Sequence, residues 1–417
     1  MTTLRFCFPT TFYPPYSFGG DAVGVQRLAR GLVKRGHHVT VVHDVDAYNA
    51  LHHGPLRAAD SDGHGVEVVS LSSGAGALSP LLTQQTGRPT LNAGKLRELL
   101  DDGNFDVINF HNSSLIGGPG IFGYGGSATR LYMAHEHWLV CPTNVLWRHN
   151  RELCDRRECT RCQLAYHRPP QLWRHTGYLH DQLRHIDSFI AMSAFSRDKH
   201  YEFGFPRSME VLPQFLPDPD PDPVAPQPAI AAHTSPHRRP YFLFVGRLEK
   251  MKGLEQVIPL FRDYQDADLL IAGDGSNSGA LRALATGIVG VSFLGRVPLD
   301  NLREYYRHAI ATVVPSVCFE TFGIIIIESF KERTPVIARR LGPFPEIIDQ
   351  SSGGELFSTD GELLAALSRI QHDPAHRERL ASSGYRAYVE RWSESAVVPQ
   401  YLEIVERARS VSLQTPG

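Results

Sequence analysis

Runs of apolar and β-branched residues alternate along the chain with segments of helical periodicity. Residues 4–9 form the first such run, residues 22–35 follow with an amphipathic helical pattern, and residues 38–43 form a second apolar run. A strand, a crossover helix and a second strand of this kind make a βαβ unit, whose buried parallel strands read as continuous apolar runs. The pattern therefore predicts an α/β protein built on parallel sheets.

The same alternation continues through the rest of the chain. Further strands are predicted over residues 105–111, 130–135, 188–193, 209–213, 241–246, 268–272, 291–295, 309–315 and 335–338. The proline-rich stretch 217–240 interrupts the pattern, because a proline-locked segment cannot join a central strand. The helical pattern over 385–407 is expected to break near Pro399, since proline removes a helical N–H. We predict an N-terminal domain over residues 1–215, a linker over 216–240, a C-terminal domain over 241–390 and a C-terminal helix over 391–417 that returns to the N-terminal domain.

Composition narrows the class of protein. The chain has 417 residues, 42% of them hydrophobic and 21% charged, which is typical of a soluble globular protein with two or three domains. A formal net charge of −2 argues against a general nucleic-acid binder. The chain shows neither a signal-peptide pattern at its start nor an apolar run long enough to cross a membrane, so we expect a cytoplasmic protein.

Two carboxylates surround the start of a helix predicted over residues 323–331. Glu320 lies in the turn before the helix, and Glu328 lies one to two helical turns inside it. The free N–H groups of Phe322, Gly323 and Ile324, together with the positive helix end, favour an anion such as a diphosphate. Taken alone, the two glutamates are explained better by a helix cap at Glu320 and a solvated surface charge at Glu328 than by a binding site.

Other polar residues follow predicted strands in the same way. Arg247 and Lys252 lie in the turn after strand 241–246, and His111 and His135 end strands of the first half. In a doubly wound sheet the carboxyl ends of the strands converge on one crevice, where such folds bind their ligands. We therefore expect these side chains to line binding sites.

The motifs of the second half together resemble glycosyltransferase family 4. They are Val245-Gly-Arg-Leu with Lys252-Gly253, Ala272-Gly-Asp-Gly275, Phe293-Leu-Gly295, and Glu320-Thr-Phe-Gly followed by Glu328. The first half agrees more loosely, through the Gly19-Gly20 turn and Ala134-His135. The resemblance implies the α/β GT-B fold, in which two doubly wound, Rossmann-like parallel-sheet domains face an interdomain cleft. It also implies a retaining enzyme that uses a nucleotide-diphosphate sugar and binds its acceptor in the N-terminal domain.

The resemblance also assigns roles to residues. Arg247 and Lys252 would stabilise the leaving diphosphate, Glu320 and His135 would contact the donor sugar, and Glu328 would hold the ribose. We expect Lys252 and Glu320 to lie in exposed turns. The remaining donor-binding residues implied are Gly19, Gly20, Gly246, Gly275, Arg296, Val297, Thr321, Phe322, Gly323 and Ile324. His111 is expected on the acceptor side.

The function implied is hexosyl transfer from a nucleotide sugar to a hydroxyl of a polysaccharide, glycolipid or natural product, without a catalytic metal or other cofactor. A metal-dependent transferase is a competitor, because Asp44 with Asp46 and Asp60 with Asp62 form Asp-x-Asp pairs. An NAD-dependent sugar-modifying enzyme is disfavoured, since neither half has a tight Gly-x-Gly-x-x-Gly turn. A non-catalytic nucleotide-sugar sensor, or a zinc-stabilised interaction protein, is the third class.

The composition of segment 138–178 differs from that of the rest of the chain, and we interpret the segment as an insertion. It carries seven arginines against three acidic residues, three of the four tryptophans, and four cysteines. The cysteines are Cys141, Cys154, Cys159 and Cys162, which either bind a structural zinc or are four reduced thiols. The cations, together with Trp147 and Trp173, indicate a surface that docks peripherally on the inner membrane face, a lid over the acceptor cleft, or a solvated loop.

Overall fold

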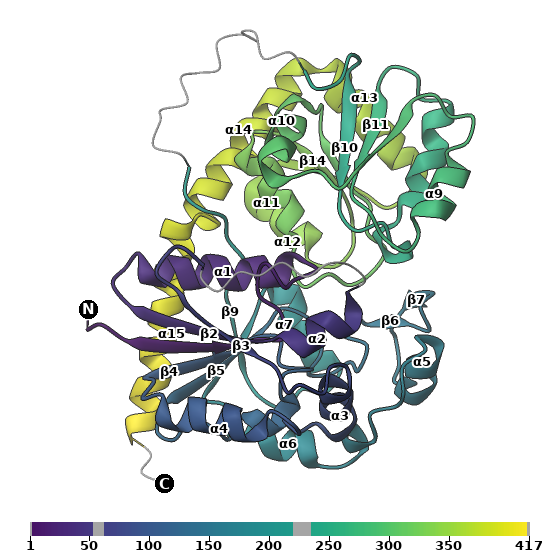
Figure 1. The fold of residues 1–417 in the computed structure, drawn as a ribbon. Coiled ribbons are helices and arrows are strands. Elements are labelled where there is room, and N and C mark those ends of the chain that lie inside the picture. The colour runs from purple at the N-terminus through teal and green to yellow at the C-terminus, as the bar shows by residue number, and fades with distance from the viewer. Residues whose placement is uncertain (1, 53–61, 220–234, 415–417) are drawn as a thin grey trace. The chain divides into compact units, whose positions relative to one another are not determined.

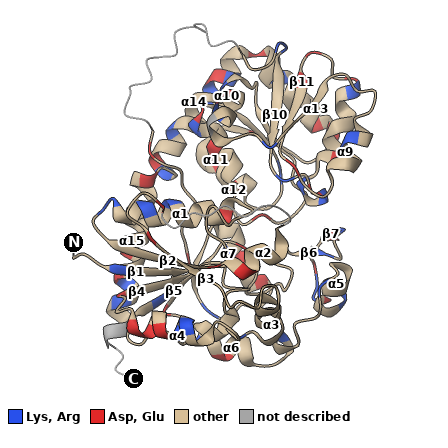
Figure 2. Cartoon of the chain, in the orientation of Figure 1, with Lys and Arg blue, Asp and Glu red and all other residues tan. Residues whose placement is uncertain are grey.

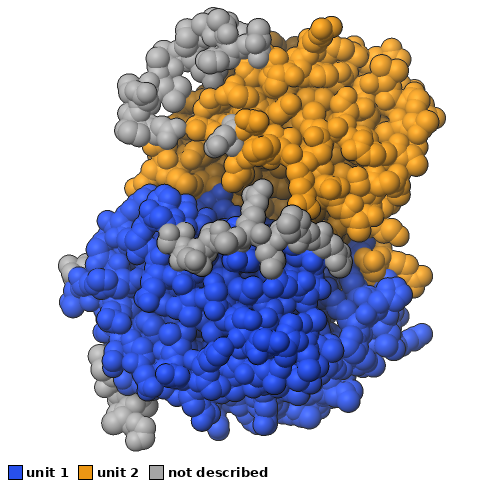
Figure 3. Space-filling view, in the orientation of Figure 1, with its two compact units in different colours: residues 1–149, 155–214, 397–417 blue, residues 150–154, 215–396 orange. Residues whose placement is uncertain are grey.

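The computed structural model of the protein describes residues 2–52, 62–219 and 235–414. The chain packs as two compact units, shown in Figure 3. Unit 1 comprises residues 1–149, 155–214 and 397–417, and unit 2 comprises residues 150–154 and 215–396. Most of the linker predicted over 216–240 lies outside the described residues.

Unit 1 is built on a seven-stranded parallel sheet with the strand order β3-β2-β1-β4-β5-β8-β9 (Figure 1). Its strands are β1 (Arg5–Pro9), β2 (His38–Asp44), β3 (Glu67–Leu71), β4 (Val107–Phe110), β5 (Thr129–Ala134), β8 (Ser188–Ala191) and β9 (Met209–Val211). The chain moves outward from β1 to β3 and then returns to place β4 on the other side of β1. The sheet therefore has its topological switch point between β1 and β4, where ligands bind in such folds.

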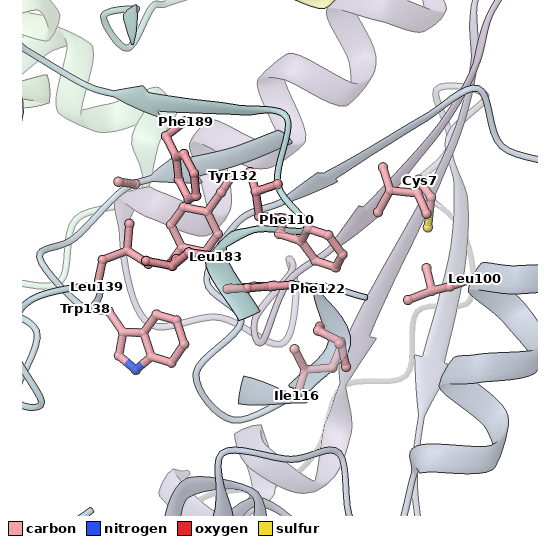
Figure 4. Close-up of a cluster of buried hydrophobic side chains, with 14 of the residues drawn as sticks. Cys7, Leu100, Phe110, Ile116, Phe122, Tyr132, Trp138, Leu139, Leu183 and Phe189 are labelled. Carbon is pink, nitrogen blue, oxygen red and sulfur yellow. The ribbon is translucent and has the colours of Figure 1, made fainter. Parts of the chain in front are cut away.

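The helices of unit 1 bury one apolar face each. In α1 the buried residues include Ala22, Val25, Ala29 and Leu32, which recur at helical spacing. A cluster of buried side chains that includes Phe110, Tyr132 and Phe189 packs against the strands (Figure 4). The remaining elements of this part of the chain are α1 (Gly20–Val33), α2 (Val45–Leu51), α3 (Leu78–Thr86), α4 (Ala93–Asp102), η1 (Gly118–Ile121), β6 (Trp147–Arg148), β7 (Glu152–Leu153), α5 (Cys159–Ala165), η2 (Leu172–His175), α6 (Tyr178–Leu183) and α7 (Ala194–Glu202).

Unit 2 has a six-stranded parallel sheet in the order β12-β11-β10-β13-β14-β15. The strands are β10 (Tyr241–Val245), β11 (Asp268–Ala272), β12 (Val291–Gly295), β13 (Thr312–Val314), β14 (Val336–Arg339) and β15 (Gly354–Phe357). Its switch point lies between β10 and β13. The helical elements are η3 (Lys250–Lys252), α8 (Leu254–Val257), η4 (Ile258–Arg262), α9 (Ser278–Leu284), α10 (Leu299–His308), α11 (Ile324–Lys331), α12 (Phe344–Ser351), α13 (Asp360–His372) and α14 (Pro374–Arg391), followed by α15 (Glu394–Gln414).

The helix break predicted near Pro399 is wrong. Helix α14 ends at Arg391 and α15 begins at Glu394, so Pro399 lies inside α15. The Ser393 hydroxyl accepts a hydrogen bond from the Ala396 N–H and so satisfies an N–H group at the start of α15. Proline removes one helical hydrogen bond, but the neighbouring Val398 and Tyr401 are fully buried, and their packing holds the helix together.

None of the helices in the described parts of the chain is long and apolar enough to cross a bilayer. Lys and Arg are interspersed with Asp and Glu over the helices of both units (Figure 2).

Candidate active site

Two loops meet at the switch point of the unit 2 sheet, one after β10 and one after β13. Gly253 ends the first loop in the left-handed conformation, with φ of +75°. A side chain there would collide with the carbonyl oxygen of Pro315 in the second loop. Glycine is therefore required where the two loops approach each other.

An ion pair joins these loops. The Lys252 Nζ lies 2.5 Å from Glu320 Oε1, and the Ser316 hydroxyl donates to the same oxygen at 2.9 Å. Burial raises the pKa of Glu320, but Lys252 and Ser316 outweigh it and hold that pKa below its usual range. Burial likewise lowers the pKa of Lys252, and Glu320 more than offsets it, so the net pKa of Lys252 is raised. Both groups are thus charged at neutral pH.

The expectation that Lys252 and Glu320 lie in exposed turns is wrong. Their side chains are only 15% and 25% exposed, because each loop packs on the other. Arg247, in contrast, is 56% exposed and forms an ion pair with Glu249 at 2.8 Å. The guanidinium of Arg247 is therefore available at the surface beside a buried, neutralised pair.

The Gly-Asp-Gly turn after β11 packs against the loop that follows β10. The Leu248 N–H donates to the Asp274 carbonyl at 2.9 Å, and the Asn277 N–H donates to the Leu248 carbonyl at 2.8 Å. Gly246 and Gly275 thus lie in the same pair of loops as Arg247. Arg296, after β12, is 87% exposed and lies 4.0 Å from an Asp274 oxygen, which is a weak contact. Val297 packs against an apolar cluster that includes Leu270.

Helix α11 begins directly after the Glu320 loop. Gly323 is its N-cap residue, and no side chain caps the helix. The Ile326 N–H donates to the Gly323 carbonyl at 2.8 Å, whereas helix geometry gives the N–H groups of Ile324 and Ile325 no partner within the helix. The helix dipole adds positive potential there. Thr321 and the buried Phe322 lead into this turn, so the predicted anion-binding residues are brought together.

Glu328 lies in the same helix, farther from its N-terminus. The hydroxyl of Tyr306, on α10, donates to Glu328 Oε2 at 3.2 Å. Burial and the Glu328 charge raise the pKa of Tyr306 well above its usual range, so this hydroxyl stays a hydrogen-bond donor. No local sequence pattern indicates the Tyr306 contact.

In unit 1 the switch point carries two histidines. His111 follows β4 and His135 follows β5, and His111 Nδ1 lies 2.9 Å from His135 Nε2. Burial lowers the pKa of both imidazoles, so both are neutral at physiological pH. Gly24 of α1 lies beside the His135 ring, since a side chain at Gly24 would meet His135 Cε1 at 3.9 Å. The predicted turn residues Gly19 and Gly20 come directly before, as the N-cap and first residue of α1.

Sequence reasoning missed two carboxyl groups near this histidine pair. Asp21, in the first turn of α1, interacts electrostatically with both His135 and Glu136. Its Oδ2 also accepts a hydrogen bond from Asn112 at 3.4 Å. Glu136 directly follows His135 at the end of a strand, and this position could have marked it as a candidate site residue.

The insertion does not form the surface expected from its composition. Trp147 and Trp173 are 6% and 8% exposed, and the Trp173 indole donates to the Gln84 carbonyl at 2.9 Å. Arg174 stacks over Trp173 with its guanidinium carbon 4.7 Å from the ring centre. The two tryptophans therefore stabilise the insertion and cannot serve as membrane anchors in this conformation.

None of the six cysteines, all of which the structure describes, forms a disulfide, and Cys141, Cys154, Cys159 and Cys162 are among them. Cys141 Sγ lies 3.3 Å from the Thr143 hydroxyl, which also interacts with Cys162. Within the residues that the structure describes, no group of three or more His, Cys, Asp or Glu side chains is arranged to hold a metal ion. The structural zinc stays a prediction.

The acidic pairs of the metal-dependent alternative are used structurally where they are described. Asp44 accepts a hydrogen bond from the Ala47 N–H at 3.0 Å as the N-cap of α2. Asp46 accepts hydrogen bonds from the hydroxyls of Ser72 and Ser73. Asp60 lies outside the described residues. These contacts occupy the oxygens that a metal would require.

Two Rossmann-like parallel-sheet units, each with polar side chains at its switch point, define an α/β protein of the GT-B class. Family profiles match both halves: "Glycosyltransferase Family 4" over residues 18–218 and "Glycosyl transferases group 1" over residues 227–387. The chain belongs to these family 4 (group 1) glycosyltransferases, which confirms the resemblance seen in the sequence motifs.

Curated relatives agree with this assignment. An uncharacterized glycosyltransferase of Methanocaldococcus jannaschii is 30% identical over 174 residues, which cover 40% of this chain and 44% of the relative. An uncharacterized 42.6 kDa protein in the cps region of Klebsiella pneumoniae is 24% identical over 354 residues, which cover 81% of this chain and 85% of the relative. The alignment with the first relative thus spans less than half of that protein's length.

Solved structures share the fold. Sucrose-phosphate synthase from Thermosynechococcus elongatus matches with a TM-score of 0.72 at 18% identity, over 98% of this chain and 100% of that chain. The Anabaena protein HepE, in complex with UDP-glucose, matches with a TM-score of 0.66 at 15% identity, over 97% of this chain and 100% of that chain. At these identities the likeness shows the fold alone.

Proposed function

We propose that this protein transfers a hexose from a nucleoside-diphosphate sugar to a hydroxyl group of an acceptor, with retention of the anomeric configuration and without a catalytic metal. The observation that carries the proposal is the Lys252–Glu320 pair beside the uncapped start of α11, at the switch point of unit 2. Family membership and the UDP-glucose bound to the fold relative HepE support a nucleotide-sugar donor.

The proposed roles follow from charge. Negative charge grows on the leaving diphosphate as the sugar–phosphate bond breaks, and groups fixed to meet that charge lower the barrier. Lys252 and Arg247 provide positive charge, and the N–H groups at the start of α11 provide hydrogen-bond donors. These groups supply the neutralisation that a metal ion supplies in other transferases.

The carboxylates of unit 2 have binding roles in this proposal. Glu320 accepts hydrogen bonds from hydroxyls of the donor sugar, in place of the one it now accepts from Ser316. Glu328, held by Tyr306, accepts hydrogen bonds from the ribose hydroxyls. No protein nucleophile is assigned, because the leaving phosphate can take the proton of the acceptor hydroxyl.

The biological setting follows from the family and is part of the proposal. The acceptor belongs to polysaccharide, glycolipid or glycosylated natural-product synthesis, and the reaction takes place in the cytoplasm. Peripheral contact with the inner membrane face stays a prediction, since the two tryptophans that suggested it are buried.

A thermal-shift panel of nucleoside diphosphates and their sugars tests the proposal, because a ligand of the folded state raises the apparent melting temperature. We expect one nucleotide family to raise the Tm, with no change when a chelator is added. Release of nucleoside diphosphate from that donor would then distinguish an enzyme from a sensor. A response to NAD alone, or loss of the shift with chelator, would overturn the metal-independent transferase.

A further inference from the structure

Glu136 has an unusual environment for a carboxyl group. It follows β5 at the carboxyl edge of the unit 1 sheet, and its Oε2 accepts a hydrogen bond from Asn144 Nδ2 at 3.0 Å. Its other oxygen, Oε1, is buried and accepts no hydrogen bond from the described residues. Leaving a buried carboxyl oxygen without a donor costs free energy, so a purely structural role would be filled better by an apolar side chain.

The loop that follows Glu136 fixes this geometry. The N–H of His137 donates to the Asn144 carbonyl at 2.9 Å, and Asn144 adopts the left-handed conformation with φ of 76°. The backbone therefore brings the Asn144 amide back to Glu136. One carboxyl oxygen is held in place while the other is left without a donor, as expected for a group built to meet a ligand.

The surroundings of Glu136 indicate what that ligand is. Asp21 on α1 and His135 lie beside Glu136 at the switch point, and His135 is bonded to His111. Both imidazoles are neutral, and Asp21, whose effect on Glu136 is larger than that of either Arg168 or Arg174, repels further negative charge. A phosphate or carboxylate group would therefore be disfavoured here, whereas a neutral hydroxyl can both donate and accept hydrogen bonds.

We propose that Glu136 is an acceptor-binding residue, and that its carboxyl group hydrogen-bonds to a hydroxyl of a neutral polyhydroxylated acceptor such as a sugar or cyclitol ring. This inference rests on the proposed glycosyltransferase function and names the acceptor class. Asn144 is the positioning residue for Glu136. The two histidines and Asp21 complete the proposed acceptor site on unit 1.

The charge state of Glu136 fits a neutral ligand. Burial and the nearby Asp21 raise its pKa to about 8, while Asn144, Arg168 and Arg174 oppose that rise. Tyr132 also faces this carboxyl, and its own pKa is raised. Glu136 is thus mainly protonated at neutral pH and becomes an acceptor-only carboxylate as the pH rises through about 8.

The test uses the full chain, the donor found in the thermal-shift panel, and three acceptor probes. The probes are methyl α-D-glucopyranoside, methyl α-D-glucuronide and methyl 2-amino-2-deoxy-α-D-glucopyranoside, and nucleoside-diphosphate release is measured for each. We expect the neutral glucoside to stimulate release most. Glu136→Ala should lower kcat/KM for the glucoside by about tenfold or more while the KM for the donor stays unchanged.

Two further variants separate binding from folding. Glu136→Gln keeps a hydrogen-bonding side chain that does not ionise, so it should retain most of the activity. Its acceptor KM should stay constant as the pH rises through about 8, whereas that of the wild type should change. Glu158→Gln is the matched control, since Glu158 lies in the insertion that follows Glu136 and pairs with Arg156 at 2.7 Å. This control should behave as the wild type does.

The inference is overturned by an unchanged glucoside KM in Glu136→Ala, by preference for the glucuronide or the amine, or by absence of stimulation with every probe. These failures leave the donor-induced thermal shift intact. If the wild type shows no shift with any nucleotide, the proposed function itself has failed.

Discussion

The two units present opposite electrostatic environments at the same topological position. In unit 2, the switch point holds a lysine and a glutamate that are both charged and paired at 2.5 Å. In unit 1, it holds two neutral imidazoles 2.9 Å apart and a glutamate whose pKa is raised to about 8. Unit 2 is therefore suited to stabilise a charge that develops during reaction, whereas unit 1 is suited to recognise neutral hydroxyl groups.

This difference also concerns stability. Lys252 and Glu320 of unit 2 are half-buried and stay charged, because the attraction between them offsets the cost of removing each charge from water. The buried histidines of unit 1 avoid the burial cost by staying neutral. Mutation of one partner disrupts the charged pair of unit 2, whereas a fall in pH charges the neutral histidines of unit 1. The comparison between the units can therefore be tested.

The largest effect is expected in unit 2. Lys252→Ala and Glu320→Ala should each lower transfer by about a thousandfold, because each removes a group that meets the reacting diphosphate or sugar. Each also leaves a half-buried charge without its ion-pair partner, so each should lower the free energy of unfolding, and the double variant should be less destabilised than the sum of the two. Steady-state rates and urea unfolding measure both effects.

Lys250→Ala is the control for these variants. Lys250 lies in the same short turn as Lys252 but is exposed, and it should keep normal activity. Near-normal transfer by Lys252→Ala, or an equal loss in Lys250→Ala, would show that the charged pair is not the reacting site.

Lowering the pH should destabilise unit 1 more than unit 2. Burial lowers the pKa of His43, His135 and His200 to about 4, so the unfolded state binds more protons between pH 6.5 and 4 and stability falls as the pH drops through that window. The raised pKa values of Glu136 and Asp44 act in the opposite direction. We expect a net loss of about 2 kcal/mol in unit 1 between pH 6.5 and 5.

Unit 2 should resist the same change. The pKa values of Glu320 and Glu355 are lowered, so their contribution is present above the usual glutamate pKa and is lost only as the pH falls through their folded pKa values. Hydrogen exchange on peptides from β4 and from β13 can follow the units separately. Equal loss of protection in both units between pH 6.5 and 5 would contradict the comparison.

The smallest effect is expected at His111. His111→Phe fills the space but removes the hydrogen bond between His111 and His135 Nε2, so the His135 ring should be held less firmly and transfer should fall by about tenfold. The nucleotide-induced thermal shift should be unchanged. Nitrogen NMR of the His135 ring should show an altered tautomer balance, which a loss of packing alone would not produce.

His200→Phe is the control for this variant. His200 is a buried histidine of α7 whose ring bonds to the Ser196 carbonyl at 2.7 Å and takes no part in the His111–His135 hydrogen bond. It should cost stability without changing the transfer rate per folded molecule. If both variants lower transfer equally, the His111 effect is one of folding.

Much of unit 2 could be predicted from the sequence because its chemistry is local. The strand before Pro315, the turn with Glu320 and the helix start at Ile324 are continuous in the chain, and their spacing alone places a carboxylate beside free N–H groups. Strand positions in both units followed in the same way from apolar runs. The GT-B fold was predictable from motifs that lie in order along the chain.

The tertiary structure alone decided which distant side chains meet. Lys252 and Glu320 are 68 positions apart, His111 and His135 are 24 apart, and Asp21 is still farther from Glu136. Their pairing sets the pKa values, and no local pattern encodes burial or a partner from another strand. The same reason explains why the helix break predicted at Pro399 was wrong and why Trp147 and Trp173 are buried. Residue type alone favours a helix break at proline, but packing against remote segments determined the conformation of Pro399 and the exposure of the two tryptophans.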